Sequence, residues 1–471
     1  MDAERINNKD RMSIKAGFWY TISNFITRAL GFITVPLFTR LLTQEDFGAY
    51  SNFTTWATLL SVLCTLDLYS TVSMAKIDFE KDIFGYLSSI SILGTIVSLI
   101  CYVPVICFSD SFEQIFGMDV QYIHIMFIYL LVSPAFTILQ TAYVQFMEYK
   151  PVVILTLSSS IISVLISATL VLFMDDKLFG RVIGTYGTSI LFSLAVYIYI
   201  VYKGRKFDFK YCKYALVIAL PLIPHVLSGS LLANTDRIFI RMYWGEVDLA
   251  LYSLGYTISS IVNILKNALN QAWVPWFFAN IKDKHVSKIE NVSIYYYLLF
   301  ICLSIGISLF APEIVLIMGG KSYADAINII PPVVSGMIIS FAYTFYVNIE
   351  FYHKKTSSIA LGTILSAIIN IVLNAILVPA LGYVSAAYTT TISYMFLCIF
   401  HYIIAKHVDP TKYYDNKKLF KMTLISNMIV FGMIFVYNYF YIRLALIVIY
   451  VCAMIFFIVK NKKIIKNILI R

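Results

Sequence analysis

The chain has 471 residues, of which 60% are apolar and only 13% are charged, and its formal net charge is +10 at pH 7. Soluble globular domains carry about 25% charged residues, so this composition excludes a water-soluble protein. The seven cysteines show no spacing typical of a disulfide framework or a zinc site. Six of them fall within apolar stretches, and we place only Cys212 in a loop. We therefore expect no cofactor, no metal and no catalytic residue.

Apolar stretches follow one another from residue 14 to residue 460, joined by short connections. Residues 83–108, 151–174 and 294–310 are examples without a charge in their interiors. A membrane-spanning helix needs roughly 20 mostly apolar residues, so the sequence predicts an all-α integral membrane protein with about 14 transmembrane helices. The segments between the stretches are all shorter than the roughly 50 residues that an independent domain needs.

The positive charges are unevenly distributed between alternate connections. If the N-terminus is cytoplasmic, 27 of the 36 Lys and Arg residues lie on the inner side, six on the outer side and three inside the membrane. Short-loop membrane proteins orient with the positive side inward. This predicts a multi-pass protein of the cytoplasmic (inner) membrane with both termini in the cytoplasm. The basic tail 460–471 is interpreted as part of the same bias, with attraction to anionic membrane lipids, and no nucleic-acid partner is expected.

An internal repeat has an offset of about 202 residues, as expected for a transporter built from parallel repeats. Phe38-Thr-Arg40 with Glu45 matches Phe239-Ile-Arg241 with Glu246, and similar matches follow later in both halves. The repeat predicts two parallel six-helix bundles plus an appended helix pair, with a substrate cleft between the bundles. The predicted boundaries are 1–202 for the N-terminal bundle, 203–213 for a cytoplasmic linker, 214–405 for the C-terminal bundle, and 406–471 for helices 13 and 14 with the basic cytoplasmic tail.

Five ionisable residues fall inside predicted spans: Arg28, Asp67, Asp236, Arg237 and Lys266. A charge at the bilayer centre costs at least ~2.5 to 3.5 kcal/mol, so such groups usually face a partner or a watery cavity. Three cations against two anions predict a cavity that attracts an anion. The alternative is that the groups pair as interhelical staples, Arg28 with Asp67 and Asp236 with Lys266.

Several motifs together resemble a known family. Residues 220–225, Leu-Pro-Leu-Ile-Pro-His, are followed by Asp236-Arg237 and by Leu-Tyr-Ser at 251–253. This run resembles the seventh-helix signature of the bacterial polysaccharide-export flippases of the O-antigen and capsule type, in the MOP exporter superfamily. The runs 28–41 and 320–326 resemble other elements of that family.

The resemblance implies a flippase, not an enzyme, that moves undecaprenyl-pyrophosphate-linked oligosaccharide repeat units to the outer leaflet by alternating access. A polysaccharide polymerase and a chain-length regulator are then candidate partners. By position, Arg28, Arg237 and Lys266 are candidates for contact with the anionic substrate, because Arg and Lys stabilise a pyrophosphate in a low-dielectric region. Asp67 and Asp236 are candidates for coupling to H⁺ or Na⁺.

Two alternatives remain open. A cation-coupled multidrug exporter of the same superfamily would be expected to prefer an acidic cavity, whereas the intramembrane charges here are positive on balance. A membrane-embedded polysaccharide polymerase or glycosyltransferase generally needs a large extramembrane loop or domain, and the predicted outer loops are too short.

Overall fold

The computed structural model describes the backbone of residues 2–460, and the side chains within it except those of residues 2–16, 18, 21, 24 and 457–460. The predicted tail beyond residue 460 and the basic side chains of the first 16 residues lie outside this description. All regular structure in the described chain is helical, without any strand, which confirms the predicted all-α class. The chain divides into two compact units, Met1–Ala250 (unit 1) and Leu251–Arg471 (unit 2), which are described separately below.

Ten helical segments of the described chain are long and apolar enough to cross a membrane. An eleventh is obtained if Gln44–Thr65 and Leu68–Asp78, which meet at a 48° bend, form one broken span. One of the ten, Phe209–Lys282, contains a kink at Gly245 where two helices join. The stretches predicted at 83–108, 151–174 and 294–310 are helical over almost all of their length. The exact number of 14 spans stays a prediction.

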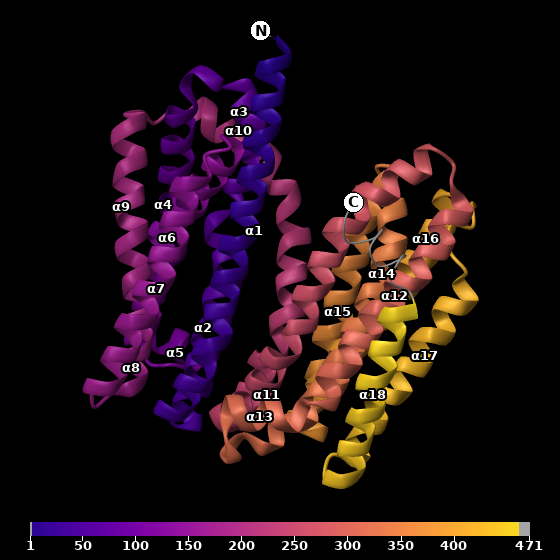
Figure 1. Cartoon of the computed structure of the whole chain (residues 1–471). Coiled ribbons are helices and arrows are strands. Elements are labelled where there is room, and N and C mark those ends of the chain that lie inside the picture. Colours follow the sequence, from indigo (N-terminus) through magenta and orange to yellow (C-terminus); the bar gives the residue numbers. More distant parts are fainter. Residues whose placement is uncertain (1, 461–471) are drawn as a thin grey trace. The chain divides into compact units, whose positions relative to one another are not determined.

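Unit 1 is a bundle of long helices with short helices at both ends (Figure 1). Helices α3 and α10 lie at the end from which the N-terminal part of α1 extends, and α5 and α8 lie at the opposite end. The elements are α1 (Asp2–Leu41), α2 (Gln44–Thr65), η1 (Leu68–Thr71), α3 (Val72–Asp78), η2 (Glu80–Asp82), α4 (Ile83–Cys107), α5 (Ser109–Phe116), α6 (Val120–Gln145), α7 (Tyr149–Phe173), α8 (Lys177–Val182), η3 (Ile183–Gly187), α9 (Thr188–Gly204), α10 (Phe209–Ala219), η4 (Leu220–Leu222) and the first arm of α11 (Ile223–Lys282).

The α2 helix begins and ends at clearly defined signals. A capping box marks its start, since the Thr43 hydroxyl accepts from the Asp46 backbone N–H and the Asp46 carboxylate accepts from the Thr43 N–H. At its end, Leu66 and Asp67 both take left-handed backbone angles, with φ of 49° and 53°. Such angles are rare for residues other than glycine, and they stop the helix without a proline or a glycine. The chain restarts at once in η1 and α3.

The kink in α11 has a different cause. Gly245 adopts φ 84° and ψ −171°, a conformation that essentially only glycine reaches. The next residue, Glu246, presents its carbonyl group to Gly48 of α2 so closely that a Cβ on Gly48 would lie 1.9 Å from the oxygen. Both glycines are therefore needed for α2 to pack against the corner of α11.

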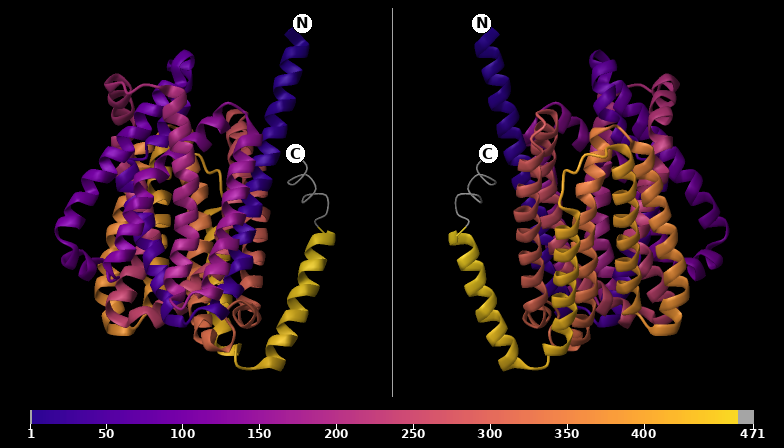
Figure 2. Two further views of the ribbon diagram at one scale, coloured as in Figure 1. Left: turned by 90° about the vertical axis from the view of Figure 1, so that its left-hand side faces the viewer. Right: turned by 90° about the vertical axis from the view of Figure 1, so that its right-hand side faces the viewer.

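Unit 2 is organised around α14, in which 20 of 23 residues are buried. Figure 2 shows α18 leaning away from the other helices of the unit toward its C-terminal end. Near the start of α18, Arg443 donates to Glu313 Oε1 over 2.6 Å and so ties it to α13. The elements are the second arm of α11, α12 (Val286–Leu309), α13 (Ala311–Gly319), η5 (Lys321–Ile329), α14 (Ile330–Tyr352), α15 (Thr356–Leu381), α16 (Ser385–Val408), α17 (Asn416–Gly432), η6 (Met433–Val436) and α18 (Phe440–Lys460).

One prediction about the cysteines was wrong. Cys212 is not in a loop but in α10, where its side chain is 1% exposed and its thiol contacts the carbonyl of Ser89 at 3.7 Å. The basic residues around Cys212 gave the segment a loop-like composition. The helix buries an apolar face, formed by residues such as Ala215 and Ala219, while its lysines stay exposed.

Candidate functional site

Two of the predicted site residues, Arg28 on α1 and Asp67 just after α2, lie in different settings. Arg28 is exposed on α1 and makes no ion pair with the residues that the structure describes. Asp67 is 4% exposed and sits in the left-handed break between α2 and η1. The carbonyl of Asp67 accepts from both the N–H and the hydroxyl of Ser70. Arg28 and Asp67 are therefore not stapled together, and the carboxylate is placed where the span is broken.

The neighbouring residues Asp236 and Arg237 lie on the first arm of α11. Asp236 is 1% exposed, whereas Arg237 is partly exposed. The guanidinium of Arg237 donates to Asn234 Oδ1 over 3.1 Å and lies 3.4 Å from the carbonyl of Ala233, both on its own helix. The two charged groups differ in exposure, as expected for adjacent positions on a helix.

Lys266 lies on the second arm of α11, in unit 2. Its ammonium group donates to the hydroxyl of Ser340 on α14 over 2.9 Å. One turn further along, the side-chain amide of Asn348 donates to Asn270 over 3.1 Å, so polar groups line both helices at this contact. No described carboxylate of unit 2 forms an ion pair with Lys266. The Ser340 hydroxyl gives this ammonium group a hydrogen bond but no opposite charge.

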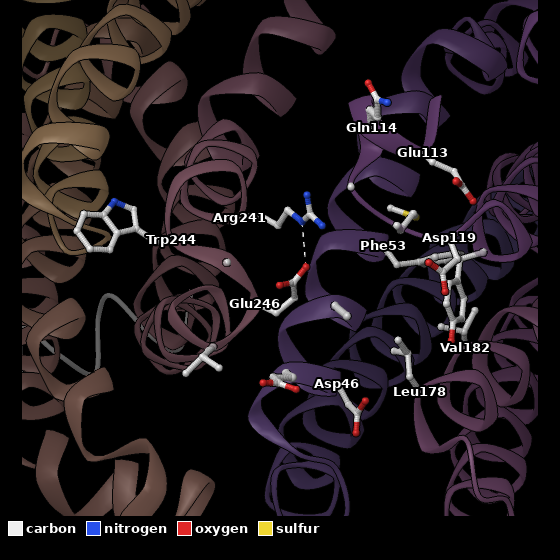
Figure 3. Close-up of a pocket in the computed structure, with 17 residues that line it drawn as sticks. Asp46, Phe53, Glu113, Gln114, Asp119, Leu178, Val182, Arg241, Trp244 and Glu246 are labelled. Carbon is white, nitrogen blue, oxygen red and sulfur yellow. Dashed lines mark hydrogen bonds and ion pairs between the residues drawn. The ribbon is translucent and has the colours of Figure 1, made fainter. Parts of the chain in front are cut away.

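A cavity of about 740 Å³ in unit 1 is formed where α2, α5 and the corner of α11 meet (Figure 3). Arg241 and Glu246 flank the corner and point toward one another, with Nε 3.0 Å from Oε1. Trp244 points to the other side of α11. The sequence matched this pair to Arg40 and Glu45 in the repeat, and Glu45 also lines the cavity.

This cavity is acidic. Five carboxylates line it against the single guanidinium of Arg241. Some of them are already engaged, because Asp46 caps α2 and Glu113 accepts from the backbone N–H of Val120 over 2.5 Å. No group of three or more His, Cys, Asp or Glu side chains in the described chain is arranged to hold a metal ion. The carboxylates are those of Glu45, Asp46, Glu113, Asp119 and Glu246.

Arg181 makes contacts that the sequence did not reveal, because its partners are distant in the chain. Its guanidinium stacks over the ring of Phe38 at 3.5 Å and lies 4.5 Å from the ring of Tyr50. It also donates to the hydroxyl of Ser167 over 2.8 Å. Cation–π contacts of this kind stabilise an arginine without a carboxylate. The helix after Arg181 forms a π-helical turn at Ile183–Gly187, a feature frequent at functional sites.

A second missed group is a buried acid–base pair in unit 2. Glu350 of α14 and His401 of α16 are 0% and 1% exposed, and His401 Nδ1 lies 2.6 Å from Glu350 Oε1. The other carboxylate oxygen accepts from the hydroxyl of Ser358. His401 Nε2 is buried without a hydrogen-bond partner in the described structure. The only sequence signal was the internal repeat, in which Glu148-Tyr149 matches Glu350-Phe351 at the same offset of about 202 residues.

Outside the spans, one loop carboxylate has a clearly shifted pKa. Burial raises the pKa of Asp409, but hydrogen bonds from Thr411, Tyr413 and His353 outweigh it and lower the pKa to about 2. The Tyr413 hydroxyl donates to Asp409 Oδ2 over 2.8 Å, and His353 Nε2 lies 2.9 Å from the same atom. This loop after α16 is therefore held to the end of α14 by a carboxylate that stays ionised at neutral pH.

Comparisons with known proteins now identify the family. Residues 13–281 match the family of polysaccharide biosynthesis proteins. The Lsg locus putative protein 1 of Haemophilus influenzae is 26% identical over 370 residues, covering 74% of this chain and 87% of the relative. An uncharacterized membrane protein of the same organism is 25% identical over 378 residues, covering 76% and 88%.

Two solved structures share the fold. The lipid II flippase MurJ in an inward closed conformation superposes with a TM-score of 0.69 at 15% identity, covering 95% of this chain and 99% of that one. An inward-facing multidrug resistance MATE family transporter of the MOP superfamily gives 0.58 at 15% identity, covering 83% and 96%. Because the family match spans more than half of the chain, this protein belongs to the polysaccharide biosynthesis protein family, as the motifs in the sequence indicated.

Proposed function

We propose that the protein flips an undecaprenyl-pyrophosphate-linked oligosaccharide, of the O-antigen or capsule type, across the cytoplasmic membrane by alternating access. The family and the fold support a flippase for a lipid-linked substrate. A membrane enzyme finds no such support, because both structural neighbours are described as a flippase or a transporter.

The proposal rests on the exposure and the bonding partners of the cations within the spans. Arg28 is exposed without an ion pair in the described chain, and Lys266 is bound only through a serine hydroxyl within unit 2. A charged group that merely fastened helices together would be expected to meet an opposite charge, because an uncompensated charge is costly in a bilayer. Arg28 and Lys266 are therefore suited to contact a pyrophosphate, and Arg237 is assigned the same role by its position.

The multidrug-exporter alternative is favoured by one observation. The large cavity of unit 1 is lined by five carboxylates and one arginine, as an exporter of cationic drugs would require. The two functions predict different phenotypes. Loss of a flippase leaves lipid-linked repeat units in the inner leaflet, whereas loss of a drug exporter raises the intracellular level of a cation such as ethidium.

The first prediction tests the anion contacts. Arg28→Ala and Lys266→Ala should each lower surface polysaccharide by about tenfold or more, because a hydrogen bond to a charged group is worth about 1.5 to 3 kcal/mol. Lipid-linked repeat units should accumulate in the same cells, while the amount of protein in the membrane stays unchanged. Arg28→Lys should restore little of the surface polysaccharide, because a lysine cannot donate two parallel N–H groups to the pyrophosphate as an arginine can.

The matched control is Arg443, a cation that already has a carboxylate partner in Glu313. Arg443→Ala should lower the amount of folded protein, and polysaccharide should fall only in proportion. If Arg28→Ala and Lys266→Ala behave like Arg443→Ala, the two residues are structural and the proposed substrate contact is wrong. Ethidium accumulation in these variants without lipid-linked intermediates would support the exporter instead.

A further inference from the structure

A second, smaller cavity of unit 1 differs in chemistry from the acidic one. It has a volume of about 240 Å³ and lies among α1, α6 and α7. Five of its seven lining side chains are polar, and none of the seven carries a charge. Of its two apolar side chains, Val144 is exposed and Val152 is buried. The lining residues are Tyr20, Ser23, Gln140, Thr141, Val144, Val152 and Thr156.

The cavity lies close to one end of the bundle. Gln140 comes five residues before the end of α6, and Thr156 comes seven residues after the start of α7. At a rise of 1.5 Å per residue, both side chains lie about 8 to 10 Å from those helix ends. The charge distribution predicts that this connection between α6 and α7 faces the cytoplasm, so the cavity would be reached from the side where the substrate is loaded.

The polar groups in the cavity retain unused hydrogen-bonding capacity. The Gln140 amide donates to the Thr156 hydroxyl over 3.1 Å, which leaves the Gln140 carbonyl and the Thr156 proton for another partner. The hydroxyls of Tyr20 and Thr141 donate to backbone carbonyls, and their oxygens can still accept. Ser23 is 2% exposed, and its hydroxyl has no hydrogen-bond partner among the side chains and backbone that the structure describes.

A buried hydroxyl without a partner costs about 1 to 3 kcal/mol, so its retention in a cavity needs an explanation. A lipid tail would leave the Ser23 hydroxyl and the Gln140 carbonyl without a hydrogen-bond partner. An ion would find no opposite charge among the lining residues. A neutral sugar ring satisfies the lining, because each sugar hydroxyl both donates and accepts. We propose that this cavity binds one uncharged sugar residue of the lipid-linked oligosaccharide before transport.

This assignment rests on the proposed function, since it takes the sugar to be part of a lipid-linked substrate.

The test compares two lipids and two variants. Lipid-linked repeat units are extracted from a strain that lacks this gene, and their binding to the purified full-length protein in nanodiscs is measured beside that of undecaprenyl pyrophosphate, which has no sugar. Thr141→Val removes a hydroxyl that lines the cavity, and Ser23→Val removes the unpartnered one. Thr137→Val, one turn from Thr141 on α6 and outside the cavity, is the control.

We expect Thr141→Val and Ser23→Val to weaken binding of the sugar-bearing lipid by about two- to tenfold each, the effect of one hydrogen bond, and to leave the sugar-free lipid unaffected. Thr137→Val should change neither. If both cavity variants bind the two lipids as the wild type does, the cavity holds only water and the sugar assignment is wrong. If the wild type binds neither lipid, the proposed function fails, and the sugar site fails with it.

Discussion

At the residue level, three buried or partly buried cations of this protein are stabilised in three different ways. Arg443 pairs with a carboxylate, Arg181 stacks on aromatic rings, and Lys266 is held by a serine hydroxyl. Each of the first two contacts gives the guanidinium an attractive electrostatic interaction from within its own unit. Lys266 is the exception, since a hydroxyl provides hydrogen bonding but no opposite charge. This difference separates structural cations from the proposed substrate contact.

The buried pair of Glu350 and His401 gives a prediction at the same scale. Removing one partner of a buried hydrogen-bonded pair leaves the other without its partner and costs about 1 to 3 kcal/mol, and more if the remaining group is charged. Glu350→Leu and His401→Leu should therefore each lower the melting temperature of the purified protein. The double variant should recover a large part of the loss, because neither member of the pair is then left buried alone.

A matched pair near the loop provides the control, since the side chains of His353 and Asp409 are 33% and 12% exposed. His353→Leu should have a smaller effect, because water can solvate the remaining carboxylate. If the losses of Glu350→Leu and His401→Leu simply add in the double variant, the two residues are not coupled.

At the level of elements, two helices are interrupted in different ways. The corner of α11 uses Gly245, whereas the end of α2 uses Leu66 and Asp67 in left-handed conformations that cost energy for residues with side chains. Broken helices in transporters commonly provide ion and substrate contacts, because backbone groups freed from the helix line the site. A buried carboxylate at such a break is suited to bind and release a cation.

The prediction for this element concerns coupling. Asp67→Asn should leave binding of the lipid-linked substrate intact but reduce gradient-driven flipping in proteoliposomes to the rate measured without an H⁺ or Na⁺ gradient. Asp236→Asn, the second coupling candidate, should act in the same direction. The exposed Asp78 at the end of α3 serves as the control, and Asp78→Asn should keep the response to the gradient. Full gradient-driven flipping by both Asp67→Asn and Asp236→Asn would exclude these carboxylates from coupling.

At the level of the whole molecule, the asymmetry of Lys and Arg predicts the orientation in the membrane. Cys212 cannot report it, because this residue is buried in α10. Exposed positions at helix connections are better probes. In a variant without native cysteines, Lys284→Cys and Lys412→Cys should react with a membrane-impermeant reagent only from the cytoplasmic side. Asp110→Cys and Lys321→Cys should react only from outside, and the reverse pattern would overturn the orientation.

The sequence by itself determined the class of protein and the approximate limits of its spans. Long uncharged stretches such as 83–108 must form helices in a bilayer, because each backbone polar group has to be satisfied within its own segment. The motifs around residues 220–253 were sufficient for the family. These conclusions depend on local composition and spacing, which the printed sequence shows directly.

Only the tertiary structure decided which polar groups meet. Lys266 and Ser340 are 74 positions apart, and Glu350 and His401 are 51 apart, so no local pattern links them. The break at Leu66 and Asp67 was equally hidden, because neither residue is a usual helix breaker. A hydrophobic pattern specifies that a helix is buried, but the partner of each side chain depends on how several helices pack together.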